Sequence, residues 1–370
     1  MNYNHQEENR DFNTTLLLAI SAVLFLGISS IITISIGSQS TADPMSMVWK
    51  QLFRLVSGVT LLCITAAVPF EKIKKAVPYL TVSALILLYA LPFWGVKING
   101  MRGWFRFGIL NFQPSEPGKI IFLAGLVMLL TAKRVEHFSD FCKTLLCGAY
   151  TAVWLAALLL QPDMGTAAVY AAVFPAVLFL GRIKLRYIAS LLLAGAASGV
   201  TLVMLHPYAL KRITGFLNPE QDTLGSNWHL NQLLRSVSRG SWFGVKSGNA
   251  LWSRSYLPFA YNDSSFAAIC ETTGAIGAAL IPAIFLALGL FLTGKAEKYQ
   301  LSQDRKLLVS GAAFMLIFQS FLHISVNLGL FPVTGITLVF VSYGGSSMFS
   351  GCLILGTVLS ALKQKGYKQC

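Results

Sequence analysis

The chain has 370 residues, of which 55% are hydrophobic and only 12% are charged. Soluble domains carry roughly a quarter of charged residues, so this composition excludes an ordinary soluble protein and indicates one whose apolar surface faces lipid. The formal net charge of +14 does not indicate a nucleic-acid-binding protein, because the basic residues are spread between apolar runs and form no single stripe.

Ten apolar segments are candidates to cross a bilayer, whose hydrocarbon core of roughly 30 Å needs about 20 helical residues. They are residues 14–36, 51–70, 77–94, 119–132, 145–160, 164–180, 188–205, 266–292, 307–330 and 346–362. The first run is too long for a cleavable signal peptide, so it is expected to remain as a helix. The sequence predicts an all-α integral membrane protein of about ten transmembrane helices, forming one polytopic domain over residues 1–370.

Lysine and arginine are concentrated in alternate connections between these segments. More than half of the 29 basic residues lie in residues 1–13, 72–75, 133–143, 182–186, 295–306 and 363–368. The positive-inside rule places that side in the cytoplasm. We therefore expect residues 1–13 to form a cytoplasmic tail, both termini to be cytoplasmic, and residues 206–265 to form a large extracytoplasmic loop between helices seven and eight.

The two long outer segments, residues 95–118 and 206–265, also carry basic residues, which is against the usual bias. Long loops can be translocated regardless of charge, which is one explanation. An anionic substrate at the outer surface is the other, and charge alone does not decide between them. The six cysteines include no CxxC pair, so we expect neither a disulfide framework nor a cysteine metal site.

Four polar clusters interrupt the apolar pattern on the outer side. The first ends in Gln113-Pro-Ser-Glu-Pro-Gly-Lys119, where Glu116 and Lys119 share one helix face at the membrane edge. They could bind a substrate, or they could simply start the fourth helix. The second is Gln161-Pro-Asp-Met-Gly-Thr166, where Asp163 could merely cap the sixth helix.

The third cluster closes the long loop with Leu257-Pro-Phe-Ala-Tyr-Asn-Asp-Ser-Ser-Phe266. Asp263 lies where the chain re-enters the bilayer and could be an N-cap, with Ser264 and Ser265 as rivals. Glu271 follows two turns later on roughly the same face. A carboxylate within a membrane helix is expensive, so Glu271 is a functional candidate by default.

The fourth cluster runs from Asn327 to Ser347, where Pro332, Gly335 and Gly344 interrupt a segment that is still apolar. Irregular backbone at membrane depth is tolerated only where protein or a water-filled cavity satisfies its polar groups. We therefore expect residues 331–347 to form a broken or re-entrant segment that lines a binding site.

In this order the four clusters resemble the SEDS family of bacterial membrane proteins, which includes RodA, FtsW and SpoVE. The resemblance extends from about Trp94 to Ser347. It is carried by Gln113-Pro-Ser-Glu116, Gln161-Pro-Asp-Met-Gly-Thr166, Phe216-Leu-Asn-Pro-Glu220, Pro332-Val-Thr-Gly335 and Phe340-Val-Ser-Tyr-Gly-Gly-Ser-Ser347. Each motif is short, but their joint occurrence at these spacings is specific. The short termini favour RodA over FtsW.

The resemblance implies a peptidoglycan glycosyltransferase that polymerises lipid II into glycan strands on the outer face of the bacterial cytoplasmic membrane, for cell elongation and shape. It also implies a class B penicillin-binding protein as transpeptidase partner. The essential acidic residue of the family lies just before helix eight, and Asp263 occupies that place here.

Glycosyl transfer from a lipid diphosphate needs a base for the attacking hydroxyl and cations for the departing diphosphate. We expect Asp263 to be the base. The candidate cations are Arg102, Lys119 and Arg212, and the further candidate substrate-binding residues are Gln113, Glu116, Asp163, Glu271, Ser346 and Ser347. Asp and Glu are too few for an evident all-protein metal site, and whether a divalent cation, Mg²⁺ or Mn²⁺, assists is left open.

The sequence also departs from the family pattern. Gly103 replaces the usual arginine before Trp104, and Thr272 replaces a second glutamate beside Glu271. Phe259, Tyr261, Thr337 and Val339 are further departures. They indicate a divergent member and leave its donor and acceptor preference open.

Two other functions fit parts of the pattern. A flippase for the lipid-linked precursor could use Glu271 and the broken helix as its path. A non-catalytic scaffold that recruits a transpeptidase would not need Asp263 at all. The polymerase hypothesis is favoured because the polar motifs converge on the outer face.

Overall fold

A computed structural model describes residues 2–37, 44–98, 101–108, 110–205, 210, 214–216, 227–245 and 249–363. Each of the ten predicted membrane segments contains a helix. They are α1 (Asn2–Gly37), α2 (Pro44–Ala67), α3 (Phe70–Trp94), α4 (Ser115–Thr131), α5 (Asp140–Leu159), α6 (Met164–Leu180), α7 (Leu185–Leu205), α11 (Ser265–Lys298), α12 (Gln303–Asn327) and α13 (Gly345–Leu362).

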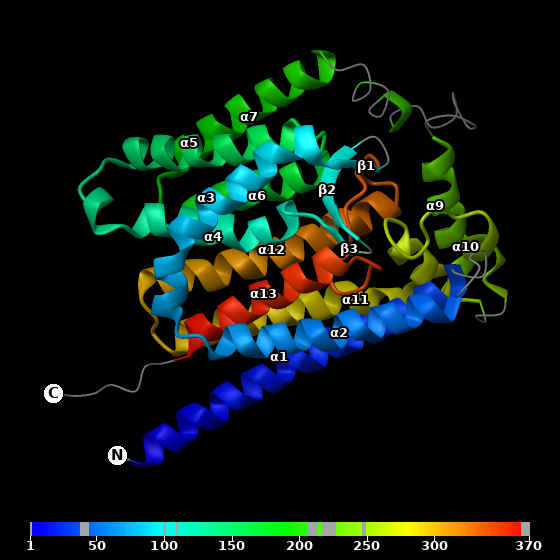
Figure 1. The fold of residues 1–370 in the computed structure, drawn as a ribbon, viewed down its shortest axis with the longest axis horizontal. Helices are drawn as coiled ribbons and strands as arrows, with labels where there is room; N and C mark the ends of the chain where they lie inside the picture. Colours follow the sequence, from blue (N-terminus) through cyan, green and yellow to red (C-terminus); the bar gives the residue numbers. More distant parts are fainter. Residues whose placement is uncertain are drawn as a thin grey trace.

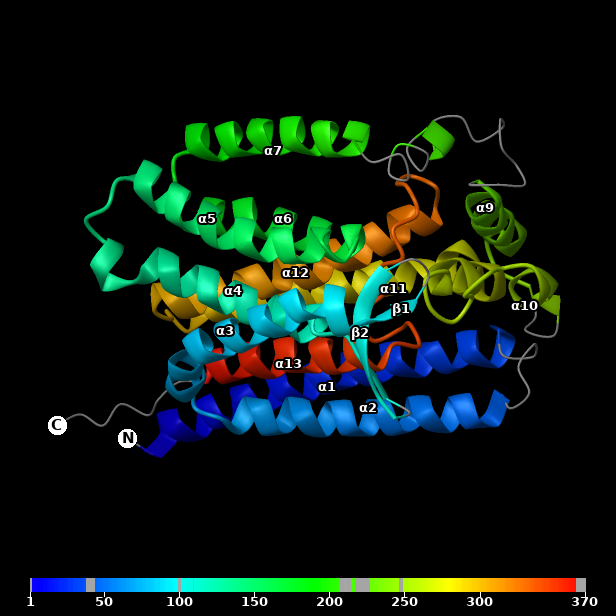
Figure 2. The same cartoon turned by 45° about the horizontal axis from the view of Figure 1, so that its top comes forward.

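Within the described ranges, seven of these helices are long and apolar enough to cross a membrane, namely α1, α2, α3, α5, α11, α12 and α13. The helix α6 is a shorter apolar helix, as is the described part of α7. The helix α4 has only 17 residues and carries the charged residues Glu116 and Lys119. Figures 1 and 2 show the helices running side by side as one bundle, which confirms a multi-pass helical architecture.

The structure also contains a small sheet and two helices that were not predicted. A small antiparallel sheet, with strand order β1-β2-β3, is formed by β1 (Val96–Ile98), β2 (Met101–Phe107) and β3 (Leu110–Phe112). The sequence of β2, Met-Arg-Gly-Trp-Phe-Arg-Phe, does not alternate strictly between polar and apolar residues, so it gives no clear strand signal. Two further helices, α9 (Trp228–Gly240) and α10 (Leu251–Ser255), lie within the long loop.

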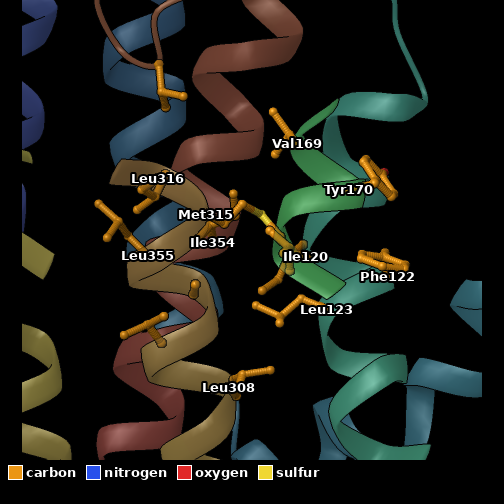
Figure 3. Packing of buried hydrophobic residues seen from close by; sticks show 14 of the residues in the cluster. Ile120, Phe122, Leu123, Val169, Tyr170, Leu308, Met315, Leu316, Ile354 and Leu355 are labelled. Atoms are coloured by element: carbon orange, nitrogen blue, oxygen red, sulfur yellow. The ribbon is translucent and has the colours of Figure 1, made fainter. Parts of the chain in front are cut away.

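The interior of the bundle is packed with apolar side chains from α4, α6, α12 and α13 (Figure 3). Aromatic rings join α4 to α5 and α6, because Phe122 lies 4.7 Å from Tyr170 and 5.8 Å from Trp154 between ring centroids. Lipid is as apolar as these side chains, so close van der Waals packing and interhelical hydrogen bonds hold the helices together, with little contribution from the hydrophobic effect.

Ion pairs lie at the end of the bundle where α1 begins and α13 ends. Asp11 of α1 accepts hydrogen bonds from Lys295 and Lys298 of α11, and Lys74 of α3 pairs with Asp304 of α12 at 2.5 Å. These lysines belong to the basic clusters that the sequence assigns to the cytoplasm. The sheet, α9, α10 and the start of α11 lie at the opposite end (Figures 1 and 2).

The helix α9 is held against a break in α11. Gly274 has φ 69° and ψ −177°, so the helix is interrupted there. The backbone groups freed by this break bond to the chain after α9, since Val245 N–H donates to Glu271 O and Ala275 N–H donates to Ser241 O, each at 2.8 Å. A side chain on Gly240 would clash, because a Cβ there would lie 1.9 Å from Cys270 O. The backbones of α9 and α11 are therefore in direct contact at Gly240 and Cys270.

Candidate functional site

Asp263 lies in a tight turn that immediately precedes α11. Asn262 N–H and Ser264 N–H both donate to Phe259 O, at 2.8 and 3.2 Å, and Phe259 has a positive φ of 51°. The N-cap of α11 is Ser264, which makes no side-chain capping bond. Asp263 is half-buried and is not the N-cap. Ser264, one residue after Asp263, thus occupies the N-cap position of α11.

Two segments distant in sequence fix the position of this turn. Asn327, at the end of α12, donates through Nδ2 to Asp263 O at 3.0 Å and accepts from Ala267 N–H at 3.0 Å. In the segment before α13, Ser342 Oγ donates to Asn262 O at 2.8 Å, and Tyr343 N–H donates to Tyr261 O at 2.7 Å. The backbone around Asp263 is thus bonded on both sides.

The chain between α12 and α13 passes beside the carboxylate. Gly335 has a positive φ of 70°, and a Cβ added there would lie 3.7 Å from Asp263 Oδ2. Glycine adopts this conformation without the steric cost that other residues incur. Of residues 331–347, which the sequence expected to be broken, residues 331–344 are irregular and include turns, whereas residues 345–347 already belong to α13 (Gly345–Leu362).

His323 supports this segment from within α12, and the sequence analysis did not single it out. The side chain is fully buried, and its Nδ1 lies 2.8 Å from Ile336 O. Its Nε2 lies 3.3 Å from Ser265 Oγ, and Ser265 Oγ lies 3.0 Å from Ser342 Oγ. A histidine in an otherwise apolar helix was the available signal, because such groups rarely enter membranes without a role.

A second group of predicted residues meets between α4, α6 and α13. Asp163 caps α6, since its Oδ1 accepts from Thr166 N–H at 3.1 Å. Its Oδ2 accepts from Gln113 Nε2 and from Ser115 Oγ, each at 3.3 Å. Gln113 N–H donates to Ser346 Oγ at 3.1 Å. The structure therefore brings Gln113, Asp163 and Ser346 together. Burial raises the pKa of the Asp163 carboxyl, although the Thr166 hydrogen bonds lower it.

The pair of Glu116 and Lys119 forms as predicted, at 2.7 Å, but it lies inside the protein rather than on an exposed face. Lys119 is fully buried, and its Nζ also donates to Gln319 Oε1 at 2.9 Å. Gln319 donates in turn to Thr337 O at 3.1 Å, and Thr337 Oγ1 donates to Ser347 Oγ at 3.0 Å. The ammonium of Lys119 is thus linked to the segment before α13 by hydrogen bonds and has no open surface of its own.

This buried pair leads to a stability prediction. The Lys119→Met substitution is expected to lower the free energy of unfolding by about 3 kcal/mol, because it leaves the Glu116 carboxylate buried without its partner. The double variant Glu116→Gln with Lys119→Met should lose less than the sum of the two single variants, since it removes both charges. Thermal unfolding of the four proteins in one detergent measures this coupling, and additive losses would contradict it.

Glu271 is fully buried in α11 and is surrounded by donors from the long loop. Its Oε1 accepts from Arg239 Nε at 3.1 Å and from Trp252 N–H at 3.2 Å. Its Oε2 accepts from Ser253 N–H at 2.7 Å, from Ser253 Oγ, and from Ser236 Oγ at 3.3 Å. In this structure the carboxylate joins α9 and α10 to α11, whereas the sequence analysis expected it to contact substrate.

The two remaining predicted cations are Arg102 and Arg212. Arg102 is exposed on β2 and donates through Nη1 to Pro92 O at 2.7 Å. Arg212 lies outside the described residues. In the part of the chain that the structure describes, no group of three or more His, Cys, Asp or Glu side chains is arranged to hold a metal ion.

Known proteins resemble this chain over nearly its whole length. The family model of a cell cycle protein that covers FtsW, RodA and SpoVE matches residues 13–367. The probable peptidoglycan glycosyltransferase FtsW of Coxiella burnetii is 32% identical over 357 residues, which are 94% of this chain and 95% of the relative. The protein of the same name from Aliivibrio salmonicida is 31% identical over 333 residues, covering 88% of this chain and 81% of the relative.

Solved structures agree with the sequence relatives. The rod shape determining protein RodA of Thermus thermophilus superposes with a TM-score of 0.70 at 25% identity, covering 95% of this chain and 97% of that one. A chain from a structure of a peptidoglycan synthase complex that coordinates polymerization and crosslinking gives a TM-score of 0.77 at 27% identity, covering 94% and 96%. Because the family model and these relatives span the whole helical bundle, the protein belongs to the SEDS family of FtsW, RodA and SpoVE, as its four motifs predicted.

Proposed function

We propose that this protein is a peptidoglycan glycosyltransferase that polymerises lipid II on the outer face of the bacterial cytoplasmic membrane. The observation that carries the proposal is the setting of Asp263. Its carboxylate is half-buried and lies one residue before the N-cap of α11, and its turn is fixed from both sides by Asn327, Ser342 and Tyr343. The names of the relatives, peptidoglycan glycosyltransferase FtsW, point to the same activity.

In the proposed reaction, a sugar hydroxyl of one substrate attacks the anomeric carbon of the sugar that is attached to the lipid diphosphate. The new carbon–oxygen bond forms while the bond from the anomeric carbon to the diphosphate oxygen breaks, and the bonding electrons leave with the diphosphate. The carboxylate of Asp263 accepts the hydroxyl proton as general base. Donors and cations near the diphosphate would stabilise the charge that it gains.

The sidedness of the reaction follows from the charge pattern. The Asp263 turn lies at the end of the bundle opposite the start of α1 and the end of α13 (Figure 1). The lysines of the other end belong to the clusters that the positive-inside rule assigns to the cytoplasm. On this basis both termini are cytoplasmic and Asp263 faces outward.

The proposal includes a transpeptidase partner, a class B penicillin-binding protein. Its support is the similarity to a chain from a synthase complex in which polymerization and crosslinking are coordinated. The stage of growth has two candidates. The similarity in structure to a rod shape determining protein RodA favours elongation and cell shape, whereas the FtsW names of the relatives favour division. Depletion of the protein separates them, because loss of an elongation enzyme gives rounded cells and loss of a division enzyme gives filaments.

A reconstitution experiment tests the proposed reaction against the flippase and the scaffold. The full-length protein is placed in lipid nanodiscs, where both leaflets are open to solution and flipping alone gives no product. Lipid II is then added with and without the transpeptidase partner. Glycan strands are expected, and they should increase when the partner is present. Nanodiscs that yield no glycan under either condition, while vesicles containing the protein translocate lipid II, would overturn the proposal in favour of the flippase.

The alternative function, a flippase for the lipid-linked precursor, could use Glu271 and the broken helix as its path. Both oxygens of Glu271 are occupied by donors from α9, α10 and their connections. This arrangement supports the polymerase over the flippase, because Glu271 is fully buried and joins the long loop to α11.

A further inference from the structure

Arg54 is a charged residue of α2 that lies within the membrane-spanning part of the helix, Met45–Ala67. Its guanidinium carbon lies 4.1 Å from the centroid of the Tyr343 ring. Its Nη1 atom is buried and has no hydrogen-bond partner in the structure. A buried guanidinium nitrogen without an acceptor is costly, and basic residues at membrane depth are usually paired or functional. The unsatisfied Nη1 atom therefore indicates a position for a hydrogen-bond acceptor of a bound ligand.

The surroundings of Arg54 are those of the candidate site. Tyr343, below the guanidinium, is bonded through its backbone to Tyr261, two residues before Asp263, and the two tyrosine rings meet edge to face at 5.8 Å. On its other side Arg54 faces Gly345, the first residue of α13, where an added Cβ would lie 3.2 Å from Arg54 Nε. Glycine at this position leaves room beside the guanidinium.

Other basic residues near the outer end are engaged differently. Lys119 pairs with Glu116, and Arg239 pairs with Glu271. Arg102 donates to a backbone carbonyl. Arg54 makes no ion pair with any residue that the structure describes. It is thus a cation beside the Asp263 turn whose charge no carboxylate of the described residues balances.

We infer that Arg54 binds a phosphate of the lipid-linked diphosphate substrate, with Tyr343 holding the guanidinium plane and Gly345 leaving space for the anion. Stacking on an aromatic face suits arginine and leaves its edge N–H groups free to bind a phosphate. Such charge-assisted hydrogen bonds are short and about twice as strong as neutral ones. This inference rests on the proposed function, and it names a diphosphate contact that the sequence analysis sought at Lys119, Arg102 and Arg212.

Binding to the full-length protein in nanodiscs of phosphatidylcholine tests the inference without any turnover. The probes are undecaprenyl diphosphate and undecaprenol, which carry the same lipid chain with and without the anion. The Arg54→Gln variant should bind undecaprenyl diphosphate about tenfold to a hundredfold more weakly than the wild type, because it loses a charge-assisted interaction. Its affinity for undecaprenol should not change.

Three further variants sharpen the test. Arg54→Lys keeps the charge but loses the planar fork, so its affinity should be intermediate. Gly345→Ala leaves Arg54 in place but crowds it, and should also weaken only the diphosphate. Arg235→Gln is the matched control, since Arg235 also lies over an aromatic ring, that of Trp252, at 5.4 Å. It should bind both probes as the wild type does.

Equal affinity of wild type and Arg54→Gln for undecaprenyl diphosphate would overturn the inference. So would a difference that disappears when phosphatidylglycerol is added in excess, because Arg54 would then bind bilayer phosphate. The outcomes separate this inference from the proposed reaction. If lipid II is polymerised but Arg54 does not affect diphosphate binding, only the Arg54 contact fails. If Arg54 affects binding but no glycan forms, the reaction fails and the anion contact stands.

Discussion

The Asp263→Asn variant is expected to lose lipid II polymerisation almost completely, by about 10²–10⁴-fold, because the amide cannot accept the hydroxyl proton. Asparagine has nearly the same shape, and the hydrogen bond from Asn327 goes to the backbone oxygen of residue 263, so the turn should persist. The measurement is the initial rate of glycan formation by purified protein, with products separated by length on a gel.

A matched substitution controls for a general effect of losing a carboxylate. Asp140 begins α5, at the connection that the sequence assigns to the cytoplasm. The Asp140→Asn variant should polymerise lipid II at the wild-type rate. Unfolding midpoints of both variants should equal that of the wild type. An Asp263→Asn protein that polymerises as fast as Asp140→Asn would exclude Asp263 as the general base.

The largest loss of stability is expected from Glu271→Ala, at about 3–5 kcal/mol. Removing the carboxylate leaves its donors without an acceptor, and each buried donor left unsatisfied costs about 1–3 kcal/mol. These donors are the backbone N–H groups of Trp252 and Ser253 and the hydroxyl groups of Ser236 and Ser253. The Arg239 side chain is 42% exposed and can be solvated instead. The loss should be local at first, with α9 and α10 detaching from α11. Thermal unfolding in detergent measures the total effect, and limited proteolysis of α9 measures the local one.

Glu297→Ala provides the comparison. Glu297 also lies in α11 and pairs with Lys306, but its side chain is 75% exposed. Exposed pairs contribute about 0–1 kcal/mol, so this variant should unfold close to the wild type and keep α9 protected from protease. If Glu271→Ala were as stable as Glu297→Ala, the network around Glu271 would not be what holds the loop.

The helical architecture could be predicted because a membrane helix requires a long apolar run, which is evident in the sequence. The small sheet could not be predicted. The strand β2 is short, and its basic, glycine and aromatic residues do not alternate strictly between polar and apolar. The helix α9 was overlooked for a similar reason, since it lies inside a long loop and is secured by the contact of Gly240 with the backbone at Cys270. No local pattern reveals a contact between two segments thirty residues apart.

The sequence predicted the site residues that belong to a recognisable motif. It did not predict the contacts that form only when distant segments fold together. The motif located Asp263, and the structure added the turn and its bonds to Asn327 and Tyr343. Spacing correctly paired Glu116 with Lys119, but it could not show that both would be enclosed with Gln319 of another helix. The sequence does not single out Arg54, because one arginine in an apolar run still fits the pattern of a membrane helix. Its importance depends on Tyr343, which lies almost three hundred residues away.

The site can act on a lipid-linked donor at the outer surface only if the Asp263 turn faces that side. This can be measured by labelling single cysteines, after replacement of the six native ones, with a membrane-impermeant maleimide. Phe259, 43% exposed, lies in the Asp263 turn, and Phe138, 48% exposed, lies in the connection between α4 and α5.

In spheroplasts, Phe259→Cys is expected to react without permeabilisation, whereas Phe138→Cys should react only after the membrane is opened. The opposite result, with Phe138→Cys labelled from outside and Phe259→Cys protected until permeabilisation, would place the Asp263 carboxylate in the cytoplasm and contradict an outer-face polymerase.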